Sequence, residues 1–499
     1  MMKTRTLASP ILSGMQATRQ TLAPGRRSWW RATLLILLLL LSVALYVLLI
    51  RVAPVPDAIL VTPFLHVWML CLVPYVLACL FVLLTKPTSR SWLWVELGII
   101  LVGALTFRVM LLPIPPDLSH DSWRYLWDAR VTLHGYSPYV YPPWDKAFLP
   151  LRDFIYDNSR FRNVPTIYPP GAQAVYLLSY LLAPSNLFFL KGIFIVFDMV
   201  TCGALALLLA RRGLDPRRVV IYAWCPLPIV EFAIQGHMDV VTLMFMVLAV
   251  LCATYSWRGS RALTGFLIGM ATLTKIYPIF LLVVILRRHD WSLLYTCFAT
   301  IIVGYVPFLI LGHGQVLGYL STYSSEQGGN AGVVQLVTYS ITHNYGFPLT
   351  TTITVERIVD LIIACGISLV VLALRLMNVG TEAKILLLIG TILAISSHVF
   401  PWYTTVLLPW IAILIGPVWT RQGLNGKGLA VFMAWYFVAA SLTGYFFKDT
   451  LDWRVYYWSV YDVVIAGLGI ALIVVMSRQV KGLRSNSLRE NLNDTKKNR

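Results

Sequence analysis

Apolar runs alternate with short segments rich in Lys and Arg along almost the whole chain. A run of roughly 17 to 25 apolar residues is long enough to cross a bilayer as a helix. By this rule the sequence predicts about fourteen crossings, so the expected fold class is an all-α polytopic membrane protein. Two neighbouring runs, Ala262–Thr274 and Ile276–Leu286, are shorter than this and meet at Lys275. The run Gly171–Ala183 is also short, and we expect it to form a helix in the membrane interface or dipping into the external face.

The distribution of Lys and Arg predicts how the crossings are oriented, because cytoplasmic loops are enriched in these residues. An Arg-rich N-terminus placed in the cytoplasm fixes all later crossings by alternation and leaves the C-terminus inside as well. The expected organisation is, in chain order, a cytoplasmic tail (1–32), three transmembrane helices (33–112), a large external loop with interfacial helices (113–185), further transmembrane helices (186–311), a second external loop (312–354), C-terminal transmembrane helices (355–476) and a cytoplasmic tail (477–499).

The composition agrees with a protein that is dissolved in lipid. Of 499 residues, 58% are hydrophobic and only 12% are charged, and the mean hydropathy is +0.72. The net charge of +18 comes from the basic segments between crossings, so it indicates membrane topology. We therefore expect no nucleic-acid partner. All seven cysteines fall inside apolar runs without a CxxC pair, which favours small buried side chains over disulfides or a thiolate metal site.

One dense polar and aromatic stretch, from Asp117 to Tyr139, interrupts the apolar pattern. Ionised side chains are costly in hydrocarbon, so this stretch must lie in an aqueous loop or line a wet cavity. Asp121 follows several prolines that stop the preceding helix, and a carboxylate near the water boundary, with a raised pKa, suits a general base. The alternative for this residue type is a loop salt bridge with Arg124 or Arg130, or a helix cap.

Spacing within the same stretch predicts a short amphipathic helix. Arg124 and Asp128 are four residues apart, as an ion pair on one helix face requires, and this gives Asp128 a structural role. We expect the neighbouring Trp123, Leu126 and Trp127 to face the membrane surface.

Other unusual polar groups emerge, by alternation, at the same external face. Lys275 is costly near lipid unless it faces a cavity or an anion such as phosphate, or snorkels to the surface. His237 and Asp239 stand at a helix junction, either as a hydrogen-bonded pair that lines the cavity or in a plain interhelical turn. The Gly-rich segment 324–332 is typical of a substrate lid or of a disordered connector. The residues expected to line one external cavity are His120, Tyr125, Tyr139, Tyr168, Gln235, His237, Asp239, Trp402 and Tyr403.

No nucleotide or metal motif accompanies these groups. The external histidines lack metal-ligand spacing, and the sequence contains no HExxH, Walker A, GxGxxG or GxSxG pattern. We therefore expect no metal and no required cofactor. A divalent cation held by Asp117 and Asp121 is an alternative that no ligand pattern supports.

Six short motifs, taken together and in order, resemble the membrane-embedded GT-C glycosyltransferases, in particular the bacterial polyprenol-phosphate-mannose-dependent mannosyltransferases. The motifs are Asp121–Asp128, His134–Tyr139, Tyr168–Pro170, Gly236–Asp239, Lys275–Pro278 and Pro401–Tyr403. In two respects the chain departs from the common pattern. Its first large loop follows the third apparent crossing instead of the first, and a single Asp stands where many relatives carry two adjacent acids, which weakens any metal-dependent scheme.

The resemblance implies transfer of a sugar, with mannose as the family-level expectation, from a polyprenyl-phosphate donor to a hydroxyl of a lipid or glycan acceptor. It places the reaction on the external face of the plasma membrane, with Asp121 as the base of an inverting displacement and the external aromatic residues against the sugar or in an interfacial belt. The candidates to bind the donor phosphate are Lys275, His343, His398, Arg124 and Arg130.

Two other classes of protein fit part of the pattern. A secondary transporter or lipid flippase also carries intramembrane ionisable groups, but these lie near the midplane and often in repeated halves, and no repeat is visible here. An assembly protein without catalysis would use the aromatic loop only for docking. The sequence leaves the sugar, the acceptor and the oligomeric state open.

Overall fold

The computed structural model describes residues 29–53, 61–323, 332–334, 348–376, 379–447 and 458–497. The chain divides into two compact units, of which unit 1 comprises residues 1–279 and 285–319 and unit 2 comprises residues 280–284 and 320–499. Nearly all the described secondary structure is helical. In the described ranges the strands are a two-residue antiparallel pair, β1 (Trp419–Thr420) and β2 (Gly423–Leu424).

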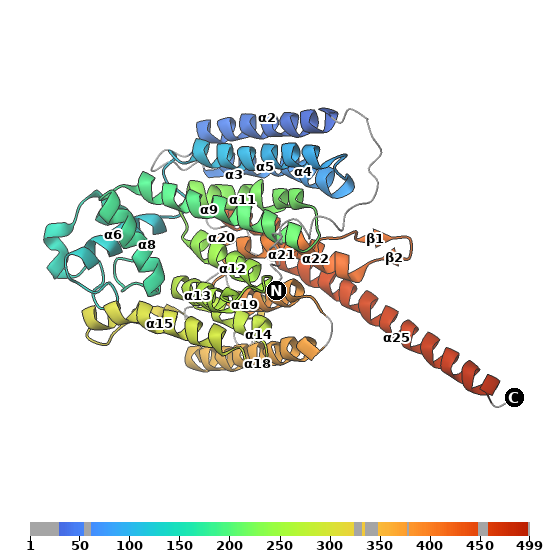
Figure 1. Ribbon diagram of the computed structural model, residues 1–499. Coiled ribbons are helices and arrows are strands. Elements are labelled where there is room, and N and C mark those ends of the chain that lie inside the picture. Colours follow the sequence, from blue (N-terminus) through green and yellow to red (C-terminus); the bar gives the residue numbers. More distant parts are fainter. Residues whose placement is uncertain are drawn as a thin grey trace, which may run out of the picture. The chain divides into compact units, whose positions relative to one another are not determined.

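Unit 1 contains long apolar helices joined by short helical pieces (Figure 1). Its elements are α2 (Trp29–Arg51), α3 (Val61–Leu70), α4 (Leu72–Leu84), α5 (Arg90–Leu111), α6 (Asp121–Leu133), η2 (Lys146–Leu151), α7 (Phe154–Asn158), α8 (Pro170–Leu182), α9 (Leu187–Arg211), η3 (Pro216–Val219), α10 (Val220–Ala223), α11 (Pro226–Ala233), α12 (Asp239–Ala253), α13 (Ser260–Thr274), η4 (Tyr277–Phe280) and α15 (Trp291–Leu311).

Seven of the described helices are long and apolar enough to cross a membrane. They support an all-α multi-pass membrane protein. Several other predicted crossings are built from shorter helices, including α12, α13, and α20 (Pro401–Thr404) with α21 (Leu408–Leu414). The seven candidate spans are Trp29–Arg51, Pro63–Leu84, Arg90–Leu111, Leu187–Arg211, Trp291–Leu311, Arg357–Arg375 and Ser459–Val480.

Residues 219–234, an apolar run among the transmembrane helices predicted for 186–311, form a broken helix instead of one continuous crossing. It consists of the end of η3, then α10 and α11, with the interruption at Cys225 before Pro226. Proline cannot donate a backbone hydrogen bond and its ring disfavours a helical residue before it, which explains the break. The segment is buried throughout, so its non-helical backbone is surrounded by protein.

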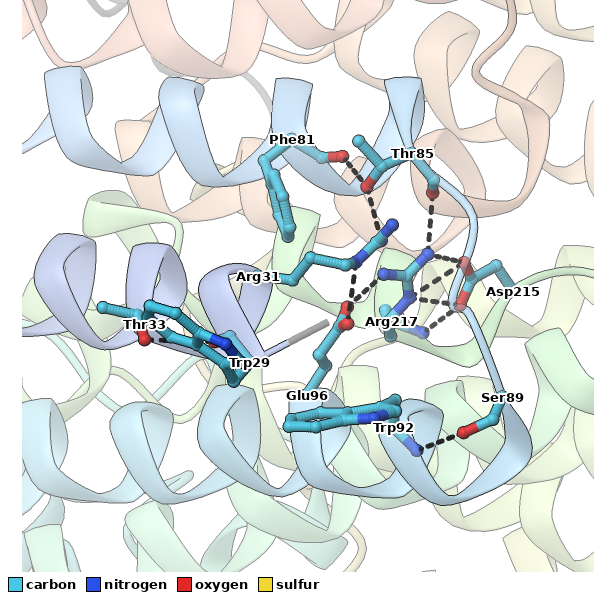
Figure 2. Close-up of polar contacts among 10 residues, drawn as sticks. All are labelled: Trp29, Arg31, Thr33, Phe81, Thr85, Ser89, Trp92, Glu96, Asp215 and Arg217. Carbon is cyan, nitrogen blue, oxygen red and sulfur yellow. Dashed lines mark hydrogen bonds and ion pairs between the residues drawn. The ribbon is translucent and has the colours of Figure 1, made fainter. Parts of the chain in front are cut away.

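A buried charge network joins the ends of several helices in unit 1 (Figure 2). Arg31 of α2 donates to Glu96 of α5 over 3.0 Å, and Arg217 of η3 contacts the other carboxylate oxygen of Glu96. Arg217 also pairs with Asp215, and both arginines bond to Thr85, at its hydroxyl over 2.8 Å and at its carbonyl over 2.7 Å. Removing one partner would leave a buried charge uncompensated, at a cost of about 3–5 kcal/mol.

A second buried ion pair joins α5 to α9. Arg108 of α5 donates to Asp198 of α9 over 2.6 Å, and both side chains are fully buried. The other Asp198 oxygen accepts from Tyr222 of α10, and Arg108 donates to the carbonyl of Ala223 over 2.8 Å. This pair therefore connects α5, α9 and the broken helix.

The loop region between α5 and α9 shares one hydrophobic core with α9, α11 and α12. The helix predicted from Arg124 and Asp128 is confirmed as α6, and their ion pair measures 2.8 Å. The prediction that Leu126 and Trp127 face the membrane surface is wrong, because α6 packs against α7 and α8 and buries both side chains. The predicted short helix at Gly171–Ala183 is α8, whose outer side exposes Leu178, Leu181 and Leu182.

In unit 2, α18 packs against α19 and α22 packs against α25, and α21 contacts both α19 and α22. Its last predicted crossing begins in η6 and continues as α25 through part of the predicted cytoplasmic tail. Cys365 on α18 is exposed, which corrects the prediction that all cysteines are buried. The elements are α14 (Leu281–Ile285), α16 (Leu320–Tyr323), α18 (Leu349–Leu376), α19 (Thr381–Ile395), α20 (Pro401–Thr404), η5 (Thr405–Leu407), α21 (Leu408–Leu414), α22 (Gly426–Ser441), α23 (Gly444–Phe447), η6 (Trp458–Asp462) and α25 (Val463–Lys497).

Candidate functional site

The segment that leads into α6 is held against the turn between α11 and α12. The buried side chain of Gln235 accepts hydrogen bonds from the backbone N–H groups of Leu118 and Ser119, at 3.2 and 3.1 Å. Gly236, with φ +68°, allows the turn to approach α6, because a Cβ there would lie 3.2 Å from the Cβ of Ser122. The turn and the first residues of α6 are therefore in direct contact.

A buried lysine strengthens this junction. Lys191 of α9 donates to the carbonyls of Ile114 and Ile234, so a single ammonium group contacts both the segment before α6 and the end of α11. The nearby Asp117 has its pKa raised by burial, and Lys191 partly opposes this effect. Both contacts bring the polar segment of the loop region and the α11–α12 turn together, although more than a hundred residues separate them in the sequence.

Asp121, the first residue of α6, is mostly buried but keeps 19% of its side chain exposed. Burial raises its pKa from 3.8 to about 6, and the negative charge of Asp239 acts in the same direction. Arg160, a hydrogen bond from Ser119 and Lys275 oppose this rise. The result is a carboxyl group that is reachable from solvent and ionised at neutral pH, yet basic enough to take up a proton.

Asp239 and Lys275 form an ion pair beside this carboxyl. Asp239 is the first residue of α12, where the helix dipole favours a negative charge, and Lys275 is the C-terminal cap of α13. Their side chains are 11% and 16% exposed. Lys275 is thus a partly exposed cation paired with a carboxylate, and both charges act on Asp121.

His237 lies between two carboxyl groups. Its Nδ1 is 3.9 Å from Asp121 Oδ2, and its Nε2 is 3.4 Å from Glu231 Oε2. The backbone N–H of His237 also donates to the carbonyl of Glu231 over 3.0 Å. Burial lowers the pKa of His237 well below its ordinary value, and Lys275 lowers it further, so the imidazole is neutral.

His120 connects the start of α6 to the end of α7. Its Nδ1 is 3.0 Å from the carbonyl oxygen of Asn158. Two residues later comes Arg160, which is exposed and whose charge acts on Asp121 more strongly than that of Lys275.

The two arginines that the sequence offered for phosphate binding have other partners. Arg124, besides its ion pair with Asp128, donates to the carbonyls of Phe161 and Val164 at 2.6 and 3.0 Å. Phe161 has φ +54°, so Arg124 stabilises the bend directly after Arg160.

Arg130 is bound in a similar way at the other end of α6. It pairs with both carboxylate oxygens of Asp153, at 2.7 and 2.9 Å, and bonds to the carbonyl of Leu151 and the hydroxyls of Tyr180 and Ser185. In this conformation Arg124 and Arg130 both use their guanidinium groups to hold the loop region.

The tyrosines of the predicted cavity are largely part of the core around α6. Tyr125 stacks on Tyr176 with ring centroids 4.3 Å apart, and its hydroxyl is 3.1 Å from that of Tyr168. Tyr139 is buried and donates to the carbonyl of Tyr168 over 2.7 Å. Burial raises the pKa of all four phenols well above the ordinary value, so they remain protonated. Tyr168 is the one of the three predicted tyrosines that keeps partial exposure.

The remaining predicted residues belong to unit 2. His398 is buried, stacks on Tyr323 with centroids 4.5 Å apart, and lies 3.1 Å from the hydroxyl of Ser397. Trp402 stacks on Phe400, and the hydroxyl of Tyr403 is 3.2 Å from that of Tyr323. They form an aromatic cluster within this unit. His343 and most of the Gly-rich segment 324–332 lie outside the described residues.

Sequence reasoning missed Glu231 and Arg160. Glu231 stands inside an apolar run, and an acidic residue in such a run is itself a signal, because it needs a partner. Arg160 has no such signal, since only the fold shows that its charge acts on Asp121. Within the described parts of the chain, no group of three or more His, Cys, Asp or Glu side chains could hold a metal ion.

Comparison with known proteins adds a reaction class. Residues 166–401 match the model of Glycosyltransferase family 87, over slightly less than half of the chain. The matched segment includes the α11–α12 turn and Lys275, whereas Asp121 precedes it. No curated protein matches the chain. The family match indicates glycosyltransferase activity, and together with the apolar helices it supports a membrane glycosyltransferase.

Proposed function

We propose that this membrane glycosyltransferase moves a sugar from a polyprenyl-phosphate donor to a hydroxyl of a lipid or glycan acceptor, with Asp121 as the general base. The observation that carries the proposal is the arrangement around Asp121: a partly exposed carboxyl group whose pKa is about 6, with Arg160 and the Lys275–Asp239 pair close enough to act on it. The reaction class follows from the family match, and the donor class from the resemblance of the sequence motifs.

The reaction is a single displacement. The acceptor hydroxyl attacks the anomeric carbon of the sugar while Asp121 accepts its proton. The bond from that carbon to the donor phosphate breaks, and polyprenyl phosphate leaves with the electron pair. The configuration at the carbon inverts. Asp121 then releases the proton to water through its exposed side.

Positive charge is needed where the phosphate departs, because negative charge develops on its oxygen. Lys275, held in place by Asp239, is one candidate, and Arg160 is a second whose planar guanidinium suits two phosphate oxygens. We assign this role to them in place of Arg124 and Arg130, whose guanidinium groups bind backbone carbonyls and carboxylates of the loop region. Roles for His343 and His398 in donor binding stay predictions from the sequence.

A lipid donor requires the reacting groups to lie near the membrane surface. The exposed leucines of α8, on a helix that packs against α6, give the loop region an apolar side suited to that position. We propose the external face of the plasma membrane, with mannose as the first sugar to test.

The test is sugar transfer by the purified protein in lipid nanodiscs, with radiolabelled polyprenyl-phosphate mannose and a lipid extract as acceptor. Asp121→Asn should lower the rate by about 10²- to 10⁴-fold, the usual contribution of a general base. Asp157→Asn, on the exposed side of α7, is the matched control and should keep the wild-type rate. Unaltered transfer by Asp121→Asn would remove the base assignment, and movement of the labelled lipid across the bilayer without transfer would favour a flippase.

A further inference from the structure

Three side chains from two distant parts of the sequence stand in a row beside the reacting carboxyl. Glu231 of α11 and His237 of the following turn are completely buried, whereas Asp121 is 19% exposed. The imidazole separates the two carboxyl groups, with Nε2 toward Glu231 and Nδ1 toward Asp121 at 3.4 and 3.9 Å. Distances of this length are common before a substrate binds, since catalytic hydrogen bonds often tighten in the complex.

A neutral imidazole carries one N–H donor and one acceptor nitrogen, so its two neighbours cannot both be charged acceptors. For Asp121 to act as a base it must be ionised, and an ionised carboxylate is stabilised by an N–H on Nδ1. Nε2 is then the acceptor, and its partner must supply a proton. The carboxyl group of Glu231, whose Oε2 lies 3.4 Å from Nε2, can do so when it is protonated.

We propose that Glu231 is a protonated carboxyl group that fixes the tautomer of His237, so that the Nδ1–H of His237 holds and orients the Asp121 carboxylate. Both are positioning residues, and the inference rests on the proposed role of Asp121 as the base. Because Oδ2 is the oxygen nearer to the imidazole, we assign Oδ1 to the acceptor hydroxyl. No proton is exchanged within the row during the reaction, so the negative charge stays on Asp121.

The opposite assignment has a distinct consequence. If Glu231 were ionised, the proton of the imidazole would sit on Nε2 and the lone pair of Nδ1 would face Asp121. That arrangement favours the protonated form of Asp121, which cannot act as a base. The state of Glu231 therefore determines whether the buried imidazole supports or opposes the reaction.

Substitutions at Glu231 separate the two assignments. Glu231→Gln keeps an N–H donor for Nε2 and should retain transfer within about threefold of wild type, with an unchanged pH profile. Glu231→Leu removes the donor, and His237→Phe removes the imidazole. In both, the midpoint for ionisation of Asp121 should move to higher pH by about one unit, the size expected for loss of a hydrogen bond to a charged group. The other groups that set this midpoint, Arg160, Asp239, Ser119 and Lys275, are unchanged in these variants.

Infrared difference spectroscopy of the carboxyl C=O stretch provides a readout that needs no turnover. At pH 7.5, Glu231→Gln should remove a protonated-carboxyl band from the wild-type spectrum, and the band that titrates near pH 6 should disappear in Asp121→Asn. Failure of Glu231→Gln to remove such a band, or an unshifted Asp121 titration in His237→Phe, would overturn the inference. Because the spectra do not depend on catalysis, failure of the proposed function would appear separately, as normal transfer by Asp121→Asn. If the Leu or Phe variant does not fold, Glu231→Gln still decides the protonation state.

Discussion

Asp239, the first residue of α12, forms an ion pair with Lys275, the C-terminal cap of α13, and both charges act on Asp121. Their effects on Asp121 are opposite, because the carboxylate raises its pKa and the ammonium lowers it. The pair can therefore place a cation beside the proposed phosphate position without changing the basicity of Asp121 greatly.

Lys275→Met should destabilise the protein by roughly 3–5 kcal/mol, because it leaves the carboxylate of Asp239 mostly buried without its partner. The double variant Asp239→Asn/Lys275→Met should recover most of this loss but should remain slow in transfer, since the cation is absent. Chemical unfolding in detergent and the transfer assay measure the two effects. If the destabilisation of the double variant equalled the sum of those of the two single variants, Asp239 and Lys275 would not be coupled.

The rate of transfer should depend on the ionisation of Asp121. Its kcat/KM should rise with pH through a midpoint near 6 and be low at pH 5, because the protonated carboxyl cannot accept a proton. A profile that is flat between pH 5 and pH 7 would contradict this assignment.

The same group makes a prediction about stability. Its pKa is higher in the folded protein, about 6, than the 3.8 of an exposed Asp, so the folded state binds more protons between these values and stability falls as pH rises through them. Asp121→Asn should therefore be more stable than wild type at pH 7.5, by up to ~3 kcal/mol, and the difference should vanish below about pH 4. Unfolding measured at both pH values tests the sign.

Arg160 and Arg162 provide a matched pair on one exposed loop. Arg160→Gln should lower the transfer rate by roughly 10- to 100-fold through loss of a phosphate contact, and should move the midpoint of the pH profile above 6, because Arg160 lowers the pKa of Asp121. Arg162, whose guanidinium lies 5.0 Å from the centre of the Tyr156 ring, should tolerate the same change. Equal losses in both variants would indicate a general effect of loop charge.

Substitutions at Gly236 and Gly213 distinguish the effect of backbone strain from that of steric contact with neighbouring side chains. Both have positive φ, +68° and +71°, but a Cβ at Gly213 meets no atom within 4 Å, whereas one at Gly236 lies 3.1 Å from the Lys191 side chain and 3.2 Å from Ser122. Each change to Ala should cost about 1–3 kcal/mol from strain. Only Gly236→Ala should also lower transfer at a temperature where both variants are folded, because it displaces the start of α6. Full activity of Gly236→Ala would mean that this contact does not position Asp121.

The local features of the fold follow from local sequence. The spacing of Arg124 and Asp128 predicts α6, and the short apolar run at Gly171–Ala183 predicts α8. The break in the crossing at Val219–Ile234 carried a readable signal in Pro226 and Pro228, but its length and hydropathy favoured one continuous span. Contacts between residues far apart in the sequence had no such signal.

The neighbours of Asp121 illustrate this limit. Nothing in the sequence indicates that the charge of Arg160 acts on Asp121, or that Glu231 lies beside the imidazole next to Asp121, because only tertiary packing brings these groups together. The same holds for Tyr125 and Tyr139, whose ring chemistry suits a sugar but whose places in the fold are in a packed core. Residue type predicted which side chains have the chemistry to contact a substrate, and packing determined which of them are accessible to it.

The network around Glu96 has a consequence for how the chain is made. Glu96 has two arginine partners, Arg31 and Arg217, and synthesis supplies them at very different times (Figure 2). Before the ribosome has reached residue 217, Glu96 of α5 can pair only with Arg31 of α2. Arg217 becomes available only after α9 has been synthesised. Nascent chains halted before that point should therefore hold α2 less firmly, and protease access near Trp29 should fall sharply once η3 is complete.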